Sequence, residues 1–280
     1  MRSLPDESYL HLPRRPRILL RRDQESWGGA VKSTKRPKIA FFDFVGCEGC
    51  QLTVLDVLQD HVSLLDAFEV VQFREAMSDK GEDYEIAFVE GSCTRTSDED
   101  RLYSIRERAQ IVVALGACAH LGGVNAIRTG MDEESVRRYV YGEHAMLFDT
   151  NSVRPIKDVI PVDAYVPGCP IGREEFVTTV KVLLQGRIPI LPDVPVCVEC
   201  KMNENVCLYW MGMNCLGPVT RAGCGAICPA NGVGCEGCRG LIPNPNLTSL
   251  KEVFSEHGFE EHVMEERMRL YLSYEARESE

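Results

Sequence analysis

The sequence lacks an apolar run of the length and purity that a membrane span needs. Its longest stretch without a formally charged side chain covers 19 residues, 109–127, but Gln110, His120, Asn125 and three glycines interrupt it. Polar groups of this kind find no partners in lipid. We therefore expect no membrane span.

An export signal is also missing from the pattern. Two arginine pairs, at 14–15 and 21–22, invite comparison with a twin-arginine signal, but no apolar stretch of signal length follows either pair before residue 35. Residues 1–38 contain ten Lys or Arg against four Asp or Glu. We expect residues 1–37 to be a basic, unexported extension, and the protein to be cytoplasmic.

Positive charge is scarce beyond that extension. The whole chain carries −11, and residues 39–280 carry −17 because the first 38 contribute +6. Such an acidic balance argues against nucleic acid as a partner. A hydrophobic content of 44% with 26% charged residues excludes a disordered or fibrous chain and is typical of a globular protein.

Cysteine, in contrast, is abundant, with 13 residues. A chain of 280 residues can bury an adequate apolar core without disulfides. Thiols stay unpaired in a reducing cytoplasm, where clustered cysteines indicate metal binding or redox chemistry. The cysteines are therefore expected to carry the function.

Short apolar runs alternate with helical spacing through the first two thirds of the chain. The runs expected to form strands are 38–46, 68–73, 85–93, 111–120 and 163–169. Helices are expected over 51–68, from Ser97 or Asp98 as a cap to 110, over 132–142 and over 172–186. Because parallel neighbours need crossover connections, this alternation predicts an α/β chain with a doubly wound parallel sheet.

The composition changes near residue 190. Pro189, Pro192 and Pro195 mark a boundary, and the 42 positions 197–238 hold eight cysteines and seven glycines. This segment therefore has few large apolar side chains, and we expect something other than a hydrophobic core to organise it. The stretch from 248 is Glu-rich, with Val253, Met264, Met268 and Leu272 at loosely helical spacing, and is expected to be a solvated or partner-facing helix.

Four cysteines of the first domain lie at or just past the ends of expected strands: Cys47, Cys50, Cys118 and Cys169. The carboxyl ends of parallel strands converge at one edge of the sheet, so these thiols are expected to meet. Four thiolates can hold zinc or a [4Fe–4S] cluster. Ligands from three distant segments favour the cluster over zinc, which usually binds two local knuckles; unligated buried thiols are a third possibility.

The second domain holds the other eight expected ligands: Cys197, Cys200, Cys207, Cys215, Cys224, Cys228, Cys235 and Cys238. Paired CxxC ends and a CxxxCP element resemble a stretched two-cluster ferredoxin run, although two zinc knuckles would also suit eight thiols. We do not divide the eight between sites by sequence adjacency. Cys93 is left over; a small buried hydrophobe is the favoured interpretation, though it could approach the first cluster.

Four motifs in order give a family resemblance: GCEGCQ at 46–51, VEGSC at 89–93, LGACAHLGG at 115–123 and VPGCP at 166–170. Together they resemble the small, electron-transferring subunit of [NiFe] hydrogenases. The resemblance implies that Cys47, Cys50, Cys118 and Cys169 hold the proximal [4Fe–4S] cluster, nearest the nickel–iron site of a separate large subunit. The homologous 20 kDa subunit of respiratory complex I usually has adjacent cysteines in place of CxxC and lacks an eight-cysteine extension.

The second domain is similar to that of cytoplasmic hydrogenase small subunits, such as the sulfhydrogenase delta subunit. Periplasmic relatives use a histidine at their distal cluster, whereas no histidine lies between 197 and 238 here. The resemblance therefore implies two further all-cysteine [4Fe–4S] clusters. Nothing matches the nickel-binding CxxC pairs of the large subunit, so the catalytic metal is expected on another chain, and no catalytic residue on this one.

We therefore expect a flavodoxin-like doubly wound sheet over 38–190, a small ferredoxin-like two-cluster domain over 191–245 and an acidic helical tail over 246–280. The expected function is electron relay in reversible H₂ oxidation between a [NiFe] large subunit and further iron–sulfur or flavin subunits. A flavin subunit that acts on NAD(P) and a heterodisulfide reductase are the two alternatives for the further redox partner. A complex I-like quinone oxidoreductase subunit and a zinc-stabilised interaction module are the alternatives.

Overall fold

The computed structural model describes residues 36–275. The predicted basic extension, 1–37, lies outside the described residues except for its last two positions. The final five residues of the expected tail, 276–280, lie outside them too. No helix in the described range is both long and apolar enough to cross a membrane.

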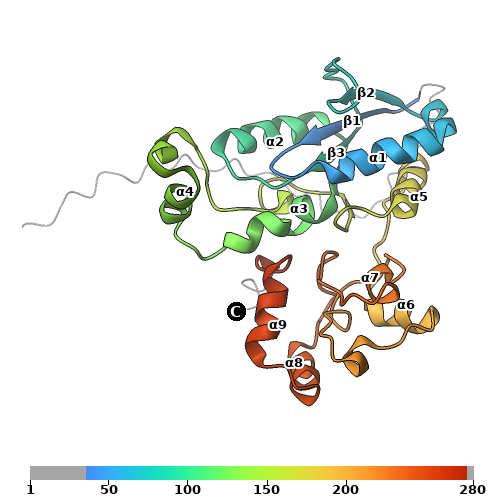
Figure 1. The fold of residues 1–280 in the computed structure, drawn as a ribbon. Helices are drawn as coiled ribbons and strands as arrows, with labels where there is room; N and C mark the ends of the chain where they lie inside the picture. The colour runs from blue at the N-terminus through green and yellow to red at the C-terminus, as the bar shows by residue number, and fades with distance from the viewer. Residues whose placement is uncertain (1–35, 276–280) are drawn as a thin grey trace, which may run out of the picture.

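A five-stranded parallel sheet forms the first domain (Figure 1). Its spatial order is β2-β1-β3-β4-β5, which is the flavodoxin-like order of a doubly wound sheet. The strand bounds are β1 Lys38–Asp43, β2 Glu69–Phe73, β3 Ile86–Glu90, β4 Ile111–Leu115 and β5 Ala164–Val166. The predicted parallel α/β sheet is thus confirmed, and each strand is shorter than the apolar run that predicted it.

Helices cover both faces of this sheet because side chains alternate along each strand. On one face, Phe41 and Phe88 pack against helices α1 and α5; on the other, Ala40 and Val89 pack against α2 and α3. The bounds are α1 Gly49–Asp60, α2 Thr96–Arg108, α3 Gly116–Leu121 and α5 Arg173–Leu184. The two apolar layers hold the sheet rigid. The carboxyl ends of its strands therefore give firm support to the segments that follow them.

Some predicted boundaries are wrong by a few residues. The helix expected over 51–68 ends at Asp60 and is followed by a 3₁₀ turn, Val62–Asp66. Neither Ser97 nor Asp98 is the cap of α2. The helix begins at Thr96, and the Asp98 carboxylate accepts hydrogen bonds from the N–H groups of Thr94 and Arg95 at 3.0 Å each. Asp98 thus reaches back from the third helical position, as in a capping box.

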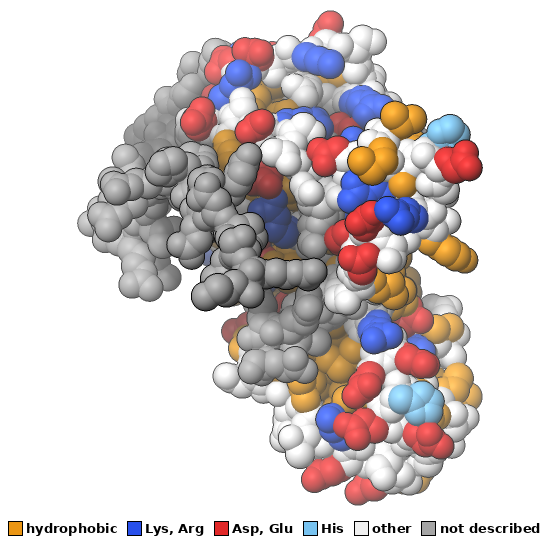
Figure 2. All heavy atoms as spheres, turned by 90° about the vertical axis from the view of Figure 1, so that its left-hand side faces the viewer, with side chains coloured by type: hydrophobic (Ala, Val, Ile, Leu, Met, Phe, Trp, Pro, Cys, Tyr) orange, Lys and Arg blue, Asp and Glu red, His pale blue; other side chains and the backbone are white. Residues whose placement is uncertain are grey.

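Beyond β4 the chain builds a lobe of short helical segments before it returns to β5. The segments are 3₁₀ turns Gly123–Arg128, Gly142–Leu147 and Ile156–Asp158, and α4 Glu133–Tyr141. Several apolar side chains of this lobe are exposed, including Tyr139, Met146 and Leu147. Figure 2 views the molecule from this side and shows acidic and basic side chains interspersed around such apolar ones.

The second part of the chain lies beneath the sheet domain in Figure 1. It consists of short helical segments joined by isolated β-bridges, with no strand in the described residues 191–275. The bounds are α6 Val196–Met202, 3₁₀ turn Leu208–Met211, α7 Ile227–Ala230, α8 Leu247–Glu256 and α9 Glu261–Arg269.

The tail expected to be one solvated or partner-facing helix instead packs against its own chain. It forms two helices, and Met264, Met268 and Leu272 are all buried. They join Leu216 of the cysteine-rich segment and Leu121 of α3 in one apolar cluster. The expectation that the cysteine-rich segment has no hydrophobic core was therefore wrong, because the tail supplies the missing apolar side chains.

Candidate metal centres

The four first-domain cysteines lie at the carboxyl edge of the sheet. Cys47 follows β1 and Cys169 follows β5, as predicted. Cys50 lies in α1, where a loop was expected, and Cys118 lies in α3, inside the run that was expected to form a strand. Helix α3 starts directly after β4, so the sequence signal of a strand running to His120 was misleading, since small residues in 116–119 suit either state.

Three separate segments bring these thiols together. Cys50 has Cys118 and Cys169 among its charge neighbours, and Cys118 has Cys169 and Cys47. Gly116 shows how tight the approach is: a Cβ at this position would lie 2.4 Å from Cys50 Sγ, and its φ of +82° already favours glycine. The structure therefore assembles at one place the four residues that the motifs selected.

Burial weakens the acidity of these thiols. It raises the pKa of Cys118 to about 12, and the neighbouring Cys169 and Cys47 act in the same direction. Burial, together with the Glu90 carboxylate, also places the pKa of Cys50 far above its usual range. Both thiols therefore keep their protons at neutral pH unless a metal displaces them, and loading of such a site releases protons.

Backbone N–H groups are directed at the sulfurs. The Ile171 N–H lies near Cys50 and lowers the pKa of its thiol, and the Val124 N–H does the same at Cys118. Donors of this kind stabilise thiolate charge and tune iron–sulfur clusters. The residues present thus fit a thiolate-bound cluster by donor type, by N–H supply and by the glycine clearance at Gly116.

Glu90 is a site residue that was not among the expected ligands. It ends β3, is 3% exposed, and its two carboxylate oxygens accept hydrogen bonds from the N–H groups of Cys50 and Gln51, at 3.1 Å each. Burial raises its pKa, while these two bonds act against that rise. The carboxylate thereby caps the start of α1, and the acidic residue in VEGSC was the available signal.

In the second domain, four cysteines line a cavity of about 100 Å³: Cys197, Cys200, Cys207 and Cys215. Burial is the main reason why the pKa of Cys197 rises to about 12, and charge repulsion from the other three cysteines acts in the same direction. Cys215 Sγ accepts hydrogen bonds from the N–H groups of Gly217, at 3.4 Å, and Cys235, at 3.2 Å. Tyr209 closes one side and donates its hydroxyl hydrogen to the Cys215 carbonyl.

The other four cysteines, Cys224, Cys228, Cys235 and Cys238, lie between that cavity and the first domain. Cys238 has Cys224, Cys228 and Cys169 as charge neighbours, and the nearby Cys169 N–H acts to lower the pKa of its thiol. Burial raises the pKa of both Cys235 and Cys238 to about 12. This group therefore adjoins the first-domain group on one side and Cys215 on the other.

The Glu199 carboxylate holds the loop that carries Cys224. It accepts hydrogen bonds from the N–H groups of Gly223, at 2.8 Å, and Ala226, at 3.1 Å. This carboxylate therefore has a structural role in the second domain. Across residues 36–275, no three or more His, Cys, Asp or Glu side chains are grouped closely enough to hold one metal ion. The three groups are therefore defined by location, burial and N–H donors.

Comparison with known proteins adds the family. The model of the family described as NADH ubiquinone oxidoreductase, 20 Kd subunit, matches residues 47–183. Sulfhydrogenase 2 subunit delta of Pyrococcus furiosus is 37% identical over 221 residues, which cover 78% of this chain and 92% of the relative. The chain belongs to the small-subunit family of [NiFe] hydrogenases. It is thus a subunit of an oxidoreductase.

Two further likenesses agree with this hydrogenase family. The iron-sulfur subunit of an F420-non-reducing hydrogenase from Archaeoglobus profundus is 27% identical over 267 residues, covering 74% of this chain and 83% of the relative. A solved structure of an NAD⁺-reducing [NiFe]-hydrogenase in the H₂-reduced state contains a chain that is 28% identical, with a TM-score of 0.51. The match covers 56% of this chain and 96% of that one.

Cys93 of this hydrogenase small subunit lies apart from the three groups. It is fully buried, and its Sγ lies 3.6 Å from Arg154 Nη2 and 3.8 Å from the Arg95 carbonyl oxygen. Burial raises its pKa, and the charges that act on it come from Arg154, Asp98 and Glu99. The favoured interpretation, a small buried side chain, agrees with this environment.

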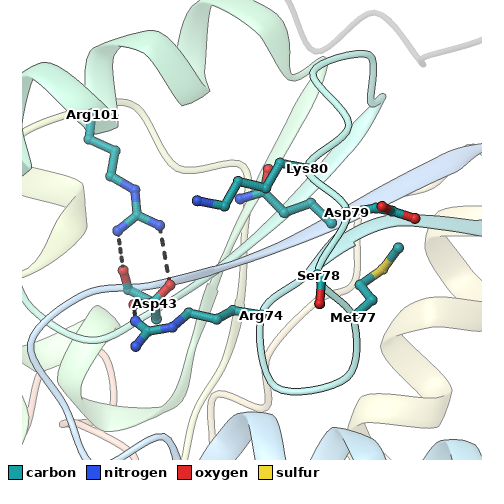
Figure 3. A pocket seen from close by; sticks show the side chains of 8 residues that line it. Asp43, Arg74, Met77, Ser78, Asp79, Lys80 and Arg101 are labelled. Carbon is teal, nitrogen blue, oxygen red and sulfur yellow. Dashed lines mark hydrogen bonds and ion pairs between the residues drawn. The ribbon is translucent and has the colours of Figure 1, made fainter.

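A cavity of about 600 Å³ lies beside the ends of β1 and β2 and is lined by none of the cysteines (Figure 3). Asp43 bonds Arg74 at 2.7 Å and Arg101 at 3.2 Å on its wall. The Arg101 guanidinium also lies 4.7 Å from the ring centre of Phe44. These contacts fix the end of β1, where the segment to Cys47 begins.

Proposed function

We propose that this chain is the iron–sulfur electron-transfer subunit of a cytoplasmic [NiFe] hydrogenase. It would relay electrons between the nickel–iron site of a separate large subunit and further redox subunits during reversible H₂ oxidation. The observation that carries the proposal is the arrangement of twelve cysteines in three groups of four. These groups follow one another from the sheet edge into the second domain.

The proposed ligand sets follow the groups. Cys47, Cys50, Cys118 and Cys169 would hold the proximal cluster. Cys224, Cys228, Cys235 and Cys238 would hold the next one, and Cys197, Cys200, Cys207 and Cys215 the last. When bound, each [4Fe–4S] cluster supplies reversible one-electron storage. The second domain would then be a ferredoxin-like two-cluster unit in function, organised by its cysteines and by the tail helices.

The protein's own residues would connect the groups along this path and shield part of it from water. Close packing of Cys238 against the Cys169 N–H supports a short route between the first two groups. Apolar cover from Leu216, Met268 and Leu272 keeps water from Cys235 of the middle group. Cys207 and Cys228 are exposed, which places parts of the second-domain groups where a redox partner can approach.

The large subunit is proposed to bind around the first group. Cys47 and Cys169 are exposed there in the isolated chain, so a partner must cover them to exclude water from the cluster. Exposed apolar side chains on the adjoining lobe, Val124, Ile127 and Met131 among them, suit such a partner. Stable heterodimer interfaces of this type often bury over about 2,000 Å².

Metal analysis of the anaerobically purified complex tests the proposal. About twelve iron and about twelve sulfide per chain are expected from three [4Fe–4S] clusters, together with nickel in a co-purifying large subunit. Zinc in place of iron would overturn the assignment in favour of a zinc-stabilised module. Iron with a nickel-free partner that reduces quinone would instead identify a complex I-like carrier.

A further inference from the structure

Arg239 is a buried cation at the junction of the two domains. Its side chain is 2% exposed, and it has the largest volume among the fully buried side chains. An ionised group is removed from water at a large cost, which must be offset by specific partners. Neither the proposed ligand sets nor the four first-domain motifs include this residue.

Its guanidinium is bonded to three separate segments. Nη1 and Nη2 donate to the two carboxylate oxygens of Glu175, at 2.6 and 2.7 Å, in a bidentate pair. Nη1 also donates to the Pro167 carbonyl at 3.1 Å, and Nε donates to the Ala222 carbonyl at 3.0 Å. A Cβ at Gly223, where φ is +120°, would lie 2.2 Å from Nη2, so a glycine is needed for this approach.

The bonded segments carry cysteines of the electron path. Pro167 precedes Cys169 by two residues, Ala222 precedes Cys224 by two, and Arg239 itself follows Cys238. Cys224 and Cys238 are also among the charges that Arg239 senses. One cation therefore joins the first-domain group to the group containing Cys224 and Cys238.

We propose that Arg239, held by Glu175, is a positioning residue that docks the two groups and sets the reduction potential of the cluster bound by Cys224, Cys228, Cys235 and Cys238. This inference rests on the proposed electron-transfer function. A nearby positive charge favours the reduced, more negative state of a cluster, and a nearby carboxylate disfavours it. The net effect depends on the balance of the pair, which makes the two charges separately testable.

Potentiometric titration of the purified complex, followed by electron paramagnetic resonance of the reduced clusters, measures this balance. Arg239→Gln removes the cation and leaves the Glu175 carboxylate, so the potential of the middle cluster is expected to fall. Glu175→Gln leaves the cation unopposed, so the potential is expected to rise. The double substitution should lie between the two single variants. All variants are titrated at the same pH and ionic strength as the wild-type complex.

A structural role alone would not produce shifts of opposite sign. Arg239→Lys keeps the charge but loses the bidentate fork, so it should hold the potential closer to wild type than Arg239→Gln does. Lys251→Gln breaks an exposed ion pair with Glu261 in the tail and should leave the potential unchanged. If Arg239→Gln fails to assemble, Glu175→Gln and Arg239→Lys still decide the matter.

The outcomes also separate this inference from the function on which it rests. A wild-type complex without iron–sulfur clusters would refute the proposed function. A wild-type complex with all three clusters, whose Glu175→Gln and Arg239 variants titrate at the wild-type potential or shift in the same direction, would overturn the role of Arg239 and leave the function intact.

Discussion

At the scale of single residues, space around sulfur decides what the first group can hold. Cys50 lies so near Gly116 that no Cβ fits between them, and Cys118 is confined in the same way by Gly123, where a Cβ would lie 2.8 Å from its Sγ. The glycines in the LGACAHLGG motif therefore act sterically, by clearing room at two thiols. Their φ angles of +82° and +57° add a backbone cost to any replacement.

Gly116→Ala is expected to prevent loading of the first group. The added methyl would overlap Cys50 Sγ, which must move away from its partners, while the second-domain groups lie elsewhere. Iron should fall from about twelve to about eight per chain, because one of the three proposed four-iron clusters is lost. Gly142→Ala is the matched control, since it also has a positive φ, +55°, but meets nothing within 4 Å. Equal iron in both variants would contradict the steric argument.

Two cysteine substitutions test the ligand map itself. Cys169→Ser is expected to lose the proximal cluster and to disconnect the large subunit electronically, whereas Cys93→Ser keeps all three clusters. The difference follows from position, because Cys93 is buried against Arg154 and Cys169 adjoins Cys118. Iron content and electron paramagnetic resonance of the dithionite-reduced complex provide the measurement. An intact proximal signal in Cys169→Ser would refute the grouping.

At the scale of elements, the end of one strand organises the start of a helix that follows another. Glu90, the last residue of β3, bonds the first free N–H groups of α1, although α1 follows β1. Strand pairing makes this possible, because Asp43 and Glu90 are register partners at the ends of β1 and β3. Cys50 is therefore placed by the sheet as well as by its own loop.

Glu90→Gln should loosen the first turn of α1. An amide offers a single acceptor oxygen, so one of the two N–H groups loses its partner, at a cost of about 1–3 kcal/mol for a charge-assisted bond. Hydrogen exchange of the peptide around Cys50 should then accelerate by about tenfold for each 1.4 kcal/mol lost. Glu174→Gln, at an exposed position in the first turn of α5, is the control. Unchanged protection of α1 in Glu90→Gln would refute the capping role.

The elements that the sequence could predict are those whose signal is local. The apolar run 38–46 and the helical spacing over 172–186 indicate β1 and α5, because strands buried on both faces are continuously apolar and α5 buries a single stripe. The meeting of Cys47, Cys118 and Cys169 also followed, since parallel strands share one carboxyl edge.

Other features depend on partners that are distant in sequence. The burial of Met268 comes from Leu216 and its neighbours, which no pattern within the tail reveals. The bonds of Arg239 to Pro167 and Glu175 cross from one domain to the other, so no local pattern around this arginine signals its burial. Both residues lie in segments of polar or glycine-rich composition, and only the tertiary arrangement makes them interior.

At the scale of the whole molecule, the cysteine-rich segment is stabilised by parts of the chain on both sides of it. Helix α3 of the first domain contributes Ala117 and Leu121 to its apolar cluster, and the tail contributes Leu250, Phe254 and Leu272. The Arg267 guanidinium also bonds the Gly234 carbonyl at 2.9 Å, next to Cys235. The second domain therefore shares its apolar core with the segments on both sides of it.

Leu272→Ala tests this shared core. Leu272 is fully buried and lies over Gly237, where a Cβ would approach its Cδ1 to 2.8 Å, so its loss leaves a cavity beside Cys235 and Cys238. Burial losses of this kind cost about 2–5 kcal/mol. Iron should fall from about twelve towards about four per chain on exposure to mild heat, as the two proposed second-domain clusters are lost before the proposed proximal one. Leu52→Ala, at a leucine of α1 with 52% exposure, makes the same chemical change and should keep its iron. If both variants lose iron together, or if Leu272→Ala retains all of it, the tail does not support the clusters and the second domain holds them with its cysteines alone.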